Sequence, residues 1–174
     1  VAVTINGNGT VTGLTALPDS AMAVGSVIQV VQSSTTTLVS TTSTSAVDST
    51  LSASITPASA SNKILVLVSQ QFRLRRTSGD STGGSFILLR GSTTIHTGPG
   101  RYGIWFQAGG SSAIDHYQRW NIQVLDSPNT TSATTYKTQL TVHNSSHNLR
   151  AQPVGVSGSG IDGKSYMTLL EVSA

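Results

Sequence analysis

The chain has 174 residues, enough for one domain with a sizeable core, and it contains no cysteine to cross-link that core. Charged residues make up 10% of the chain and the formal net charge is +3, a balance too mild to imply a nucleic-acid partner. No apolar run approaches the ~20 residues of a membrane-spanning helix, so we expect no membrane insertion. Serine, threonine, valine and glycine dominate and Glu171 is the only glutamate, so the composition favours strands over helices.

Residues 1–25 are predicted to form a separate N-terminal arm. The sequence VAVTINGNGTVTGL indicates two short strands around an Asn-Gly turn, because both residues tolerate the positive φ of a tight hairpin. Pro18 and Asp19 then mark a turn or a single helical turn. This piece has too few apolar groups for a core of its own. We therefore expect it to pack on the main body, on a sister chain or on another protein.

The stretch from Val30 to Phe72 is mostly serine and threonine, which suits either a disordered stalk or the solvent face of a sheet. From Val47 onward polar residues alternate with one apolar set, which is Val47, Leu51, Ala53 and Ile55. Period two is typical of a half-buried strand, whereas a mucin-like stalk would scatter proline. The hydroxyl groups are therefore predicted to cover the wet face of strands, and residues 33–45 fit either strand or loop.

The apolar run KILVLV at 63–68 predicts a central strand that is covered on both faces and continues as an alternating segment. Later strands are predicted at SFILLR, IHTG, IDHYQRWNIQVLD, TYKTQLTVH, LRAQPV and SYMTLLEVSA, with TSGDSTGG and residues 98–112 as loops. Seven or eight short strands separated by such turns favour a sandwich. We therefore predict that the chain is all-β and that residues 26–174 form a single antiparallel jelly-roll-like β-sandwich.

The sequence contains no convincing catalytic or metal-binding constellation. Asp115 and Asp126 flank one predicted strand and are the nearest approach to a carboxylate pair, for which a turn role is favoured. His143 and His147 are four residues apart, but HNSSH indicates a turn, and no cysteine or acidic cluster completes a metal site. No GxSxG motif occurs, and the glycines of GVSGSGIDG lack the context of a phosphate loop. We predict no enzyme activity, no metal and no cofactor.

Basic residues concentrate between Lys63 and Arg101, where Arg73, Arg75 and Arg76 lie close together. Such a stripe can meet phosphate, but a solvated strand face or ion pairs at a subunit interface are favoured.

Aromatic residues concentrate between Tyr102 and Trp120. Trp120 alternates with Ile122 and Val124 and is predicted to lie in the core. The others are candidates for stacking on a glycan or for a subunit contact, with the contact favoured. This candidate set is Tyr102, Trp105, Phe106 and Tyr117.

Three segments carry one further pattern. Residues 25–72 contain Q-V-V, a Thr/Ser stretch, S-I-T-P and then S-x-K-I-L-V-L-V; LDSPNTTSATTYKTQL and YMTLLEV follow later. This pattern resembles bacteriophage virion surface proteins of the tail-fibre and head-decoration type with a trimeric β-domain, found in aquatic phages, cyanophages included. The opening VAVTINGNGTVTGL is similar to the N-termini of phage tail-fibre proteins. The resemblance covers most of the chain and includes no catalytic motif.

The resemblance implies a non-enzymatic structural protein on the phage particle surface, commonly a homotrimer. Tail fibres usually have a long shaft, which this chain lacks, so a capsid decoration, cement or head-fibre protein is as well supported as a tail-fibre, receptor-binding component. Residues 1–25 are then expected to bind other virion proteins. Since VAVTINGNG lacks the basic start and the apolar run of an export signal, synthesis in the host cytoplasm is expected. Two alternatives are a carbohydrate-binding module for host surface glycans and, less favoured, a hydrolase of host surface polymer.

Overall fold

The computed structural model describes residues 4–5, 7, 11–12, 22–77, 81–98, 103–107, 113–153 and 163–174. All regular elements in these ranges are strands, as the composition predicted. None of the described segments is a helix that could span a membrane. β1 (Thr4–Ile5) and β2 (Val11–Thr12) pair antiparallel with each other, which confirms the predicted hairpin. The boundary of the arm at residue 25 stays a prediction.

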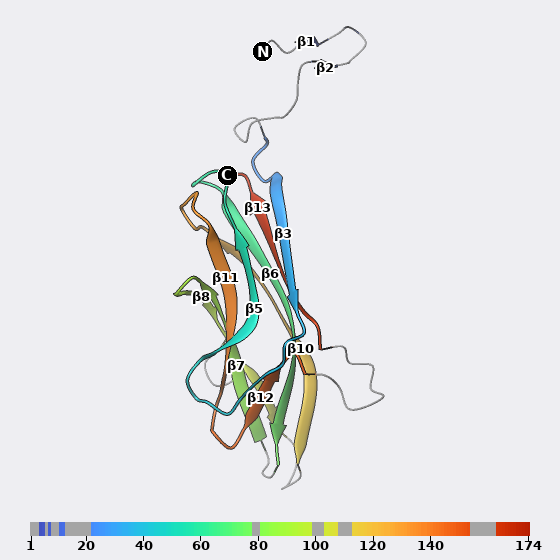
Figure 1. The fold of residues 1–174 in the computed structure, drawn as a ribbon, viewed down its shortest axis with the longest axis vertical. Coiled ribbons are helices and arrows are strands. Elements are labelled where there is room, and N and C mark those ends of the chain that lie inside the picture. The colour runs from blue at the N-terminus through green and yellow to red at the C-terminus, as the bar shows by residue number, and fades with distance from the viewer. Residues whose placement is uncertain are drawn as a thin grey trace.

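The remaining strands form two sheets that pack face to face (Figure 1). The first sheet contains β3 (Val27–Thr35), β13 (Ser165–Val172), β6 (Lys63–Arg76), β10 (Ile114–Asp126), β12 (Asn148–Ala151) and β4 (Val39–Thr41). The second sheet contains β5 (Val47–Ile55), β11 (Thr134–Val142), β7 (Ser81–Arg90), β8 (Thr93–Thr97) and β9 (Ile104–Gln107). All the pairs are antiparallel.

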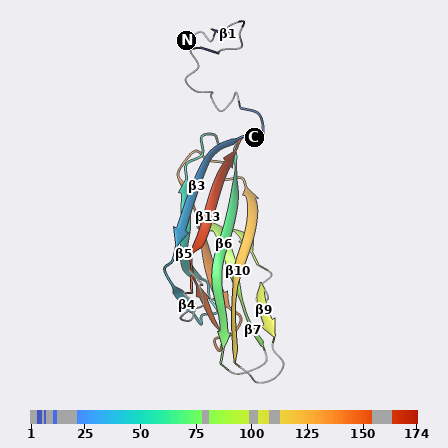
Figure 2. The same ribbon diagram turned by 90° about the vertical axis from the view of Figure 1, so that its right-hand side faces the viewer.

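The strand order is that of a jelly roll. β13 and β12 pair one after the other with the same edge of β6, and β8 and β9 do the same along β7. Each of these two pairs therefore fills one strand position. The first sheet then runs β3/β4, β13/β12, β6, β10, and the second runs β5, β11, β7, β8/β9. Figure 2 shows β3, β13, β6 and β10 side by side. This interleaving of early and late strands confirms the predicted jelly-roll sandwich.

The core between the sheets has two apolar clusters separated by polar side chains. One cluster includes Leu51, Val66 and Tyr136, and the other includes Phe72 and Phe86. Trp120, predicted to lie in the core, is half-buried and packs against both clusters.

The polar layer between the clusters is fully buried. Thr138 donates to Gln70 Oε1 over 2.8 Å, and its hydroxyl lies 2.5 Å from that of Ser49. With its amide oriented to satisfy both ends, Gln152 accepts from Gln70 Nε2 over 2.9 Å and donates to the carbonyl of Thr37. Buried polar groups need such partners, so this layer constrains how the strands can align.

The Ser/Thr alternation is explained by β5, in which Leu51, Ala53 and Ile55 are buried while Ser52 and Ser54 face solvent. Val47, predicted to share the buried face, is exposed instead at the start of the strand. Within the ambiguous stretch 33–45, β3 continues to residue 35 and β4 forms a short strand.

Two loop predictions and a second burial prediction were also wrong. The segment STGG opens β7, and β9 forms inside the predicted loop 98–112. The two segments form strands because they pair with each other, with Gly84 opposite Ile104. The KILVLV run is central, but it is covered on one face only: Ile64, Val66 and Val68 are buried, whereas Leu65 and Leu67 point outward and are half-buried.

Candidate functional site

The four predicted aromatic residues do not converge on one site. Tyr102 lies outside the described residues. Trp105 and Phe106 are adjacent on β9, so their side chains point to opposite faces of the strand. Phe106 stacks on His116 of β10, with ring centroids 4.7 Å apart, and closes the edge between the sheets. Trp105 is 39% exposed and meets the ring of His143 edge-on at 5.7 Å.

Tyr117 belongs to a charged cluster on the outer face of the first sheet. The guanidinium of Arg73 lies 5.4 Å from the centre of its ring and donates two hydrogen bonds to Asp115. These bonds, together with the positive charges of Arg73, Arg75 and Arg150, hold the pKa of Asp115 below its ordinary value. The basic stripe predicted from the sequence thus contributes an ion pair within one chain on a strand face. Arg73 is only 8% exposed, so it does not lie on the solvated face that the sequence favoured, and ion pairs at a subunit interface stay a prediction.

A pocket of about 400 Å³ lies at the edge where β9 approaches β10. Its lining residues are Phe72, Gly103, Ile104, Trp105, Gln118, Arg119, Trp120 and Asn121. Trp120 stacks on Phe86 with centroids 5.1 Å apart and anchors the pocket to the core. A partly exposed indole beside amide and guanidinium groups suits the stacking and hydrogen bonding of a sugar ring.

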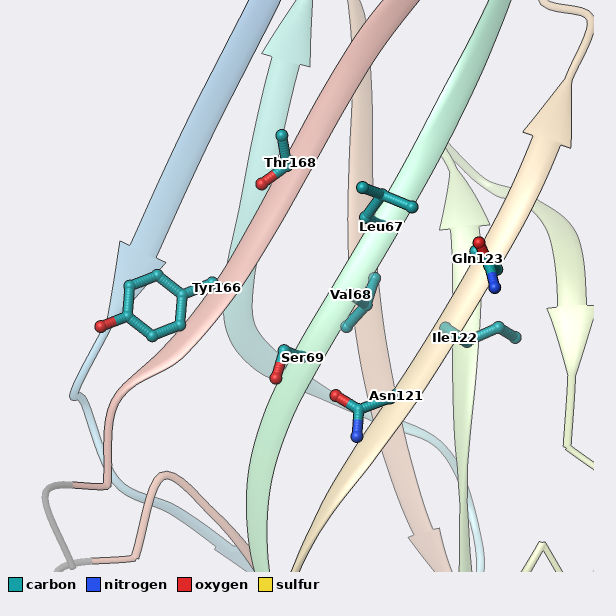
Figure 3. A pocket seen from close by; sticks show the side chains of 8 residues that line it. All are labelled: Leu67, Val68, Ser69, Asn121, Ile122, Gln123, Tyr166 and Thr168. Atoms are coloured by element: carbon teal, nitrogen blue, oxygen red, sulfur yellow. The ribbon is translucent and has the colours of Figure 1, made fainter.

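A second hollow, a groove of about 540 Å³, crosses the outer face of the first sheet (Figure 3). Leu67 and Ser69 of β6 lie along its middle. Tyr166 and Thr168 of β13 flank them on one side, and Asn121 and Gln123 of β10 on the other.

Apolar side chains form a row beside this groove that sequence reasoning missed. The register places Val30, Leu170, Leu65 and Leu125 opposite one another on four neighbouring strands. Val30 is 58% exposed and Leu125 is 55% exposed. The signal in the sequence was the spacing of Leu65 and Leu67 within KILVLV, since alternate residues of a strand face opposite sides.

The two histidines of the predicted turn have a structural role. His147 is buried: its Nδ1 accepts from the backbone N–H of Gly83 over 3.0 Å, and its Nε2 lies 3.3 Å from the Nη1 of Arg76. Burial lowers the pKa of His147, and the charge of Arg76 lowers it further. His143 lies beside it, with ring centroids 5.8 Å apart. Within the described ranges, no three His, Cys, Asp or Glu residues are placed to hold a metal ion.

The carboxylates of the described part of the chain do not form a pair. Asp115 and Asp126 lie at opposite ends of β10. Asp126 accepts hydrogen bonds from Arg90 over 2.8 Å and from the hydroxyl of Tyr136 over 2.7 Å, and burial together with this bond raises the pKa of Tyr136. Asp48 accepts from Lys137 and Gln139. The contacts of Asp48 link two paired strands, whereas those of Asp126 link the first sheet to the second. Asp126 ends β10 next to the turn that follows, but Asp115 lies within β10, so the turn role favoured for Asp115 was wrong.

No protein-family model matches the chain, and no curated protein matches it. The solved structures that it resembles include the crystal structure of the infectious bursal disease virus VP2 subviral particle, at 14% identity and a TM-score of 0.39, covering 86% of this chain and 38% of that one. Others are the structures of the infectious bursal disease virus Gx strain (13%, 0.37, covering 85% and 37%) and Gt strain (12%, 0.35, covering 86% and 37%). The chain spans less than two fifths of these proteins, and TM-scores this low support no conclusion about function.

Proposed function

We propose that this protein is a non-enzymatic structural protein of a bacteriophage virion, displayed on the particle surface as a homotrimer. The observation that supports the proposal is that the segments resembling phage virion proteins form strands of both sheets. Residues 25–72 supply β3, β4, β5 and most of β6, LDSPNTTSATTYKTQL supplies most of β11, and YMTLLEV supplies β13. The resemblance therefore involves the frame of both sheets, as a shared fold requires.

The weak charge of the chain supports assembly. Charged residues are only 10% of the sequence, fewer than a lone soluble domain usually displays. Closing copies into a ring covers sheet faces and edges by symmetry. Residues 1–25, including the β1–β2 hairpin, then attach the sandwich to other virion proteins, either on the capsid as a decoration, cement or head-fibre protein or in a tail fibre.

Quantitative mass spectrometry of purified particles tests this proposal. We expect the protein in intact virions, in hundreds of copies for a shell position or a few dozen for a tail position. Its absence from particles, in lysates where it is expressed, overturns the proposal.

Incubation of the protein with host surface polysaccharide should release no product, and release of oligosaccharide would establish a hydrolase instead.

The pocket at the β9–β10 edge favours a second candidate function, recognition of host surface glycans. Trp105→Ala should abolish binding to host polysaccharide without altering the circular dichroism spectrum, because the indole offers the exposed stacking surface. Tyr117→Ala is the matched control, since Tyr117 lies outside the pocket beside Arg73. Undiminished binding by the Trp105 variant contradicts a glycan site at this pocket.

A further inference from the structure

Three arginines share one face of the first sheet, on the neighbouring strands β6 and β12. Arg73 of β6 pairs directly with Arg150 of β12, and Arg75 lies two residues further along β6 on the same face. Like charges placed opposite each other on a sheet destabilise it. The whole chain has ten basic residues, so the concentration of three of them here calls for an anion that offsets their repulsion.

One carboxylate offsets part of this charge. Asp115 of β10 pairs in register with Arg75 and accepts two hydrogen bonds from the guanidinium of Arg73. The charges of Arg75 and Arg150 also act on this carboxylate, since both lower its pKa. Three guanidinium groups therefore share one carboxylate, and two positive charges remain unbalanced.

The other carboxylates in the described part of the chain are engaged elsewhere. Each accepts hydrogen bonds from its own partner, which links Asp48 to Lys137, Asp126 to Arg90 and Glu171 to Asn62. None of these three balances Arg75 or Arg150.

We propose that Arg75 and Arg150 form a binding site for the acidic group of a polysaccharide. A guanidinium binds a carboxylate or a phosphate through two parallel hydrogen bonds, as Arg73 binds Asp115 within the same cluster. Arg75 is exposed, so its donors can reach a ligand. The Nε of Arg150 donates to Asn148 Oδ1 over 3.1 Å, which fixes the side chain and leaves its terminal nitrogens for the ligand.

The neighbours of the arginines favour a sugar over a nucleic acid. Ser40 of β4 pairs with Arg150. Tyr117 of β10 pairs with Arg73, whose guanidinium lies 5.4 Å from the centre of its ring. Hydroxyl and aromatic groups bind the hydroxyls and the faces of sugar rings. A nucleic acid needs a longer run of cations, because its affinity comes from many phosphate contacts.

This site goes beyond the proposed structural role, and it shares no residue with the pocket at the β9–β10 edge. Its failure therefore leaves both proposed functions standing.

Calorimetric titration of the full chain with polygalacturonate, whose sugar units each carry a carboxylate, tests the site. The wild type should bind polygalacturonate but not uncharged dextran, and added salt should weaken the binding. Arg75→Gln combined with Arg150→Gln should weaken it about tenfold or more, because each arginine supplies charge-assisted hydrogen bonds. A wild type that does not bind polygalacturonate overturns the inference.

A matched control removes the same amount of charge elsewhere. Lys63 lies at the opposite end of β6, and Lys137 lies on the second sheet. Lys63→Gln combined with Lys137→Gln should bind polygalacturonate nearly as tightly as the wild type. Equal losses in the two double variants would show attraction by net charge alone and would overturn the inference.

Two further outcomes identify other occupants. Tighter binding of duplex DNA than of polygalacturonate, through the same two arginines, assigns the cluster to a nucleic acid and overturns the inference. The inference also fails if the double arginine variant, without polysaccharide, has a smaller mass by light scattering than the wild type. The cluster is then a contact between copies of the chain.

Nuclear magnetic resonance of the wild type covers a double variant that fails to fold. Galacturonate oligomers should shift the Nε–H signals of Arg75 and Arg150, which Arg75→Lys and Arg150→Lys assign. The signal of Arg90, which binds Asp126, should not move. Unmoved signals of Arg75 and Arg150 overturn the inference.

Discussion

Glu171, the only glutamate of the chain, is fully buried, and among the described residues its hydrogen-bond donors carry no charge. Its carboxylate accepts hydrogen bonds from Gln29 over 2.5 Å, from Asn62 over 2.7 Å and from the backbone N–H of Ala58 over 2.8 Å. Burial raises the pKa of Glu171, but these hydrogen bonds outweigh burial and leave the pKa below its ordinary value. The carboxylate therefore joins β3 and β13 to the turn between β5 and β6.

We expect Glu171→Gln to lower the free energy of unfolding by about 1–3 kcal/mol, because its amide N–H₂ faces donors and leaves them unsatisfied. Denaturant unfolding at pH 7 measures the loss. Asp48→Asn, at an exposed ion pair, should cost less than about 1 kcal/mol. Since the folded pKa lies below 4.5, the contribution of Glu171 is present above pH 4.5 and is lost as pH falls through the folded value. A variant as stable as wild type contradicts this role.

We expect a second loss of stability, in weak acid, from the protonation of His147. Its pKa in the folded protein is below the ordinary value near 6.5, so the unfolded chain binds the proton more readily. Stability should therefore be full above pH 6.5 and fall as pH decreases toward the folded pKa. Unfolding midpoints between pH 7.5 and pH 5 measure this slope, and His147→Asn should flatten it. An unchanged slope in the variant would assign the acid sensitivity to other groups.

At the scale of elements, β7 packs so closely against β11 and β12 that only glycine fits at position 84. A Cβ at Gly84 would lie 2.8 Å from the carbonyl oxygen of Thr141 on β11 and 3.0 Å from a methyl group of Leu149 on β12. Gly84→Ala should therefore separate these strands and cost about 1–3 kcal/mol in unfolding free energy. Gly7→Ala, where no heavy atom lies within 4 Å, is the control and should leave the sandwich unaffected. Equal stability of the two variants would contradict the close packing at β7.

Strands with a strong local pattern could be predicted from the sequence, and strands that depend on distant partners could not. The sequence TYKTQLTVH predicted β11 as a strand, and Tyr136, Thr138 and Leu140 form its buried face. Nothing local predicts that β9 pairs with the STGG segment of β7, because glycine is depleted in strands and only the partner stabilises both. The candidate site was missed for a related reason: which leucines of KILVLV face outward depends on the second sheet, which covers one side only.

At the scale of the whole molecule, we expect the predicted arm to be needed for attachment but not for the stability of the sandwich. The sandwich is closed next to the arm by local contacts: the N–H of Gly25 donates to Ser173 and the hydroxyl of Ser173 donates to Ala23. Removing residues 1–21 keeps these contacts, so the melting temperature should change by less than about 4 °C. The truncated protein should nevertheless be absent from purified particles of phage that produce it. Normal incorporation would contradict attachment through the arm.

The start of β3 and the end of β13 lie together at one extremity of the sandwich, and the turn at Asn144–Ser146 lies toward the other (Figure 1). Between them β6 extends over 14 residues, roughly 45 Å at strand rise. Under the proposed attachment through residues 1–25, the sandwich would be tethered at the β3 extremity and would act as a spacer that holds its distal turn away from the particle. Because Asn144, Ser145 and Ser146 are exposed, this turn is the place at which an inserted epitope would be most accessible to antibodies.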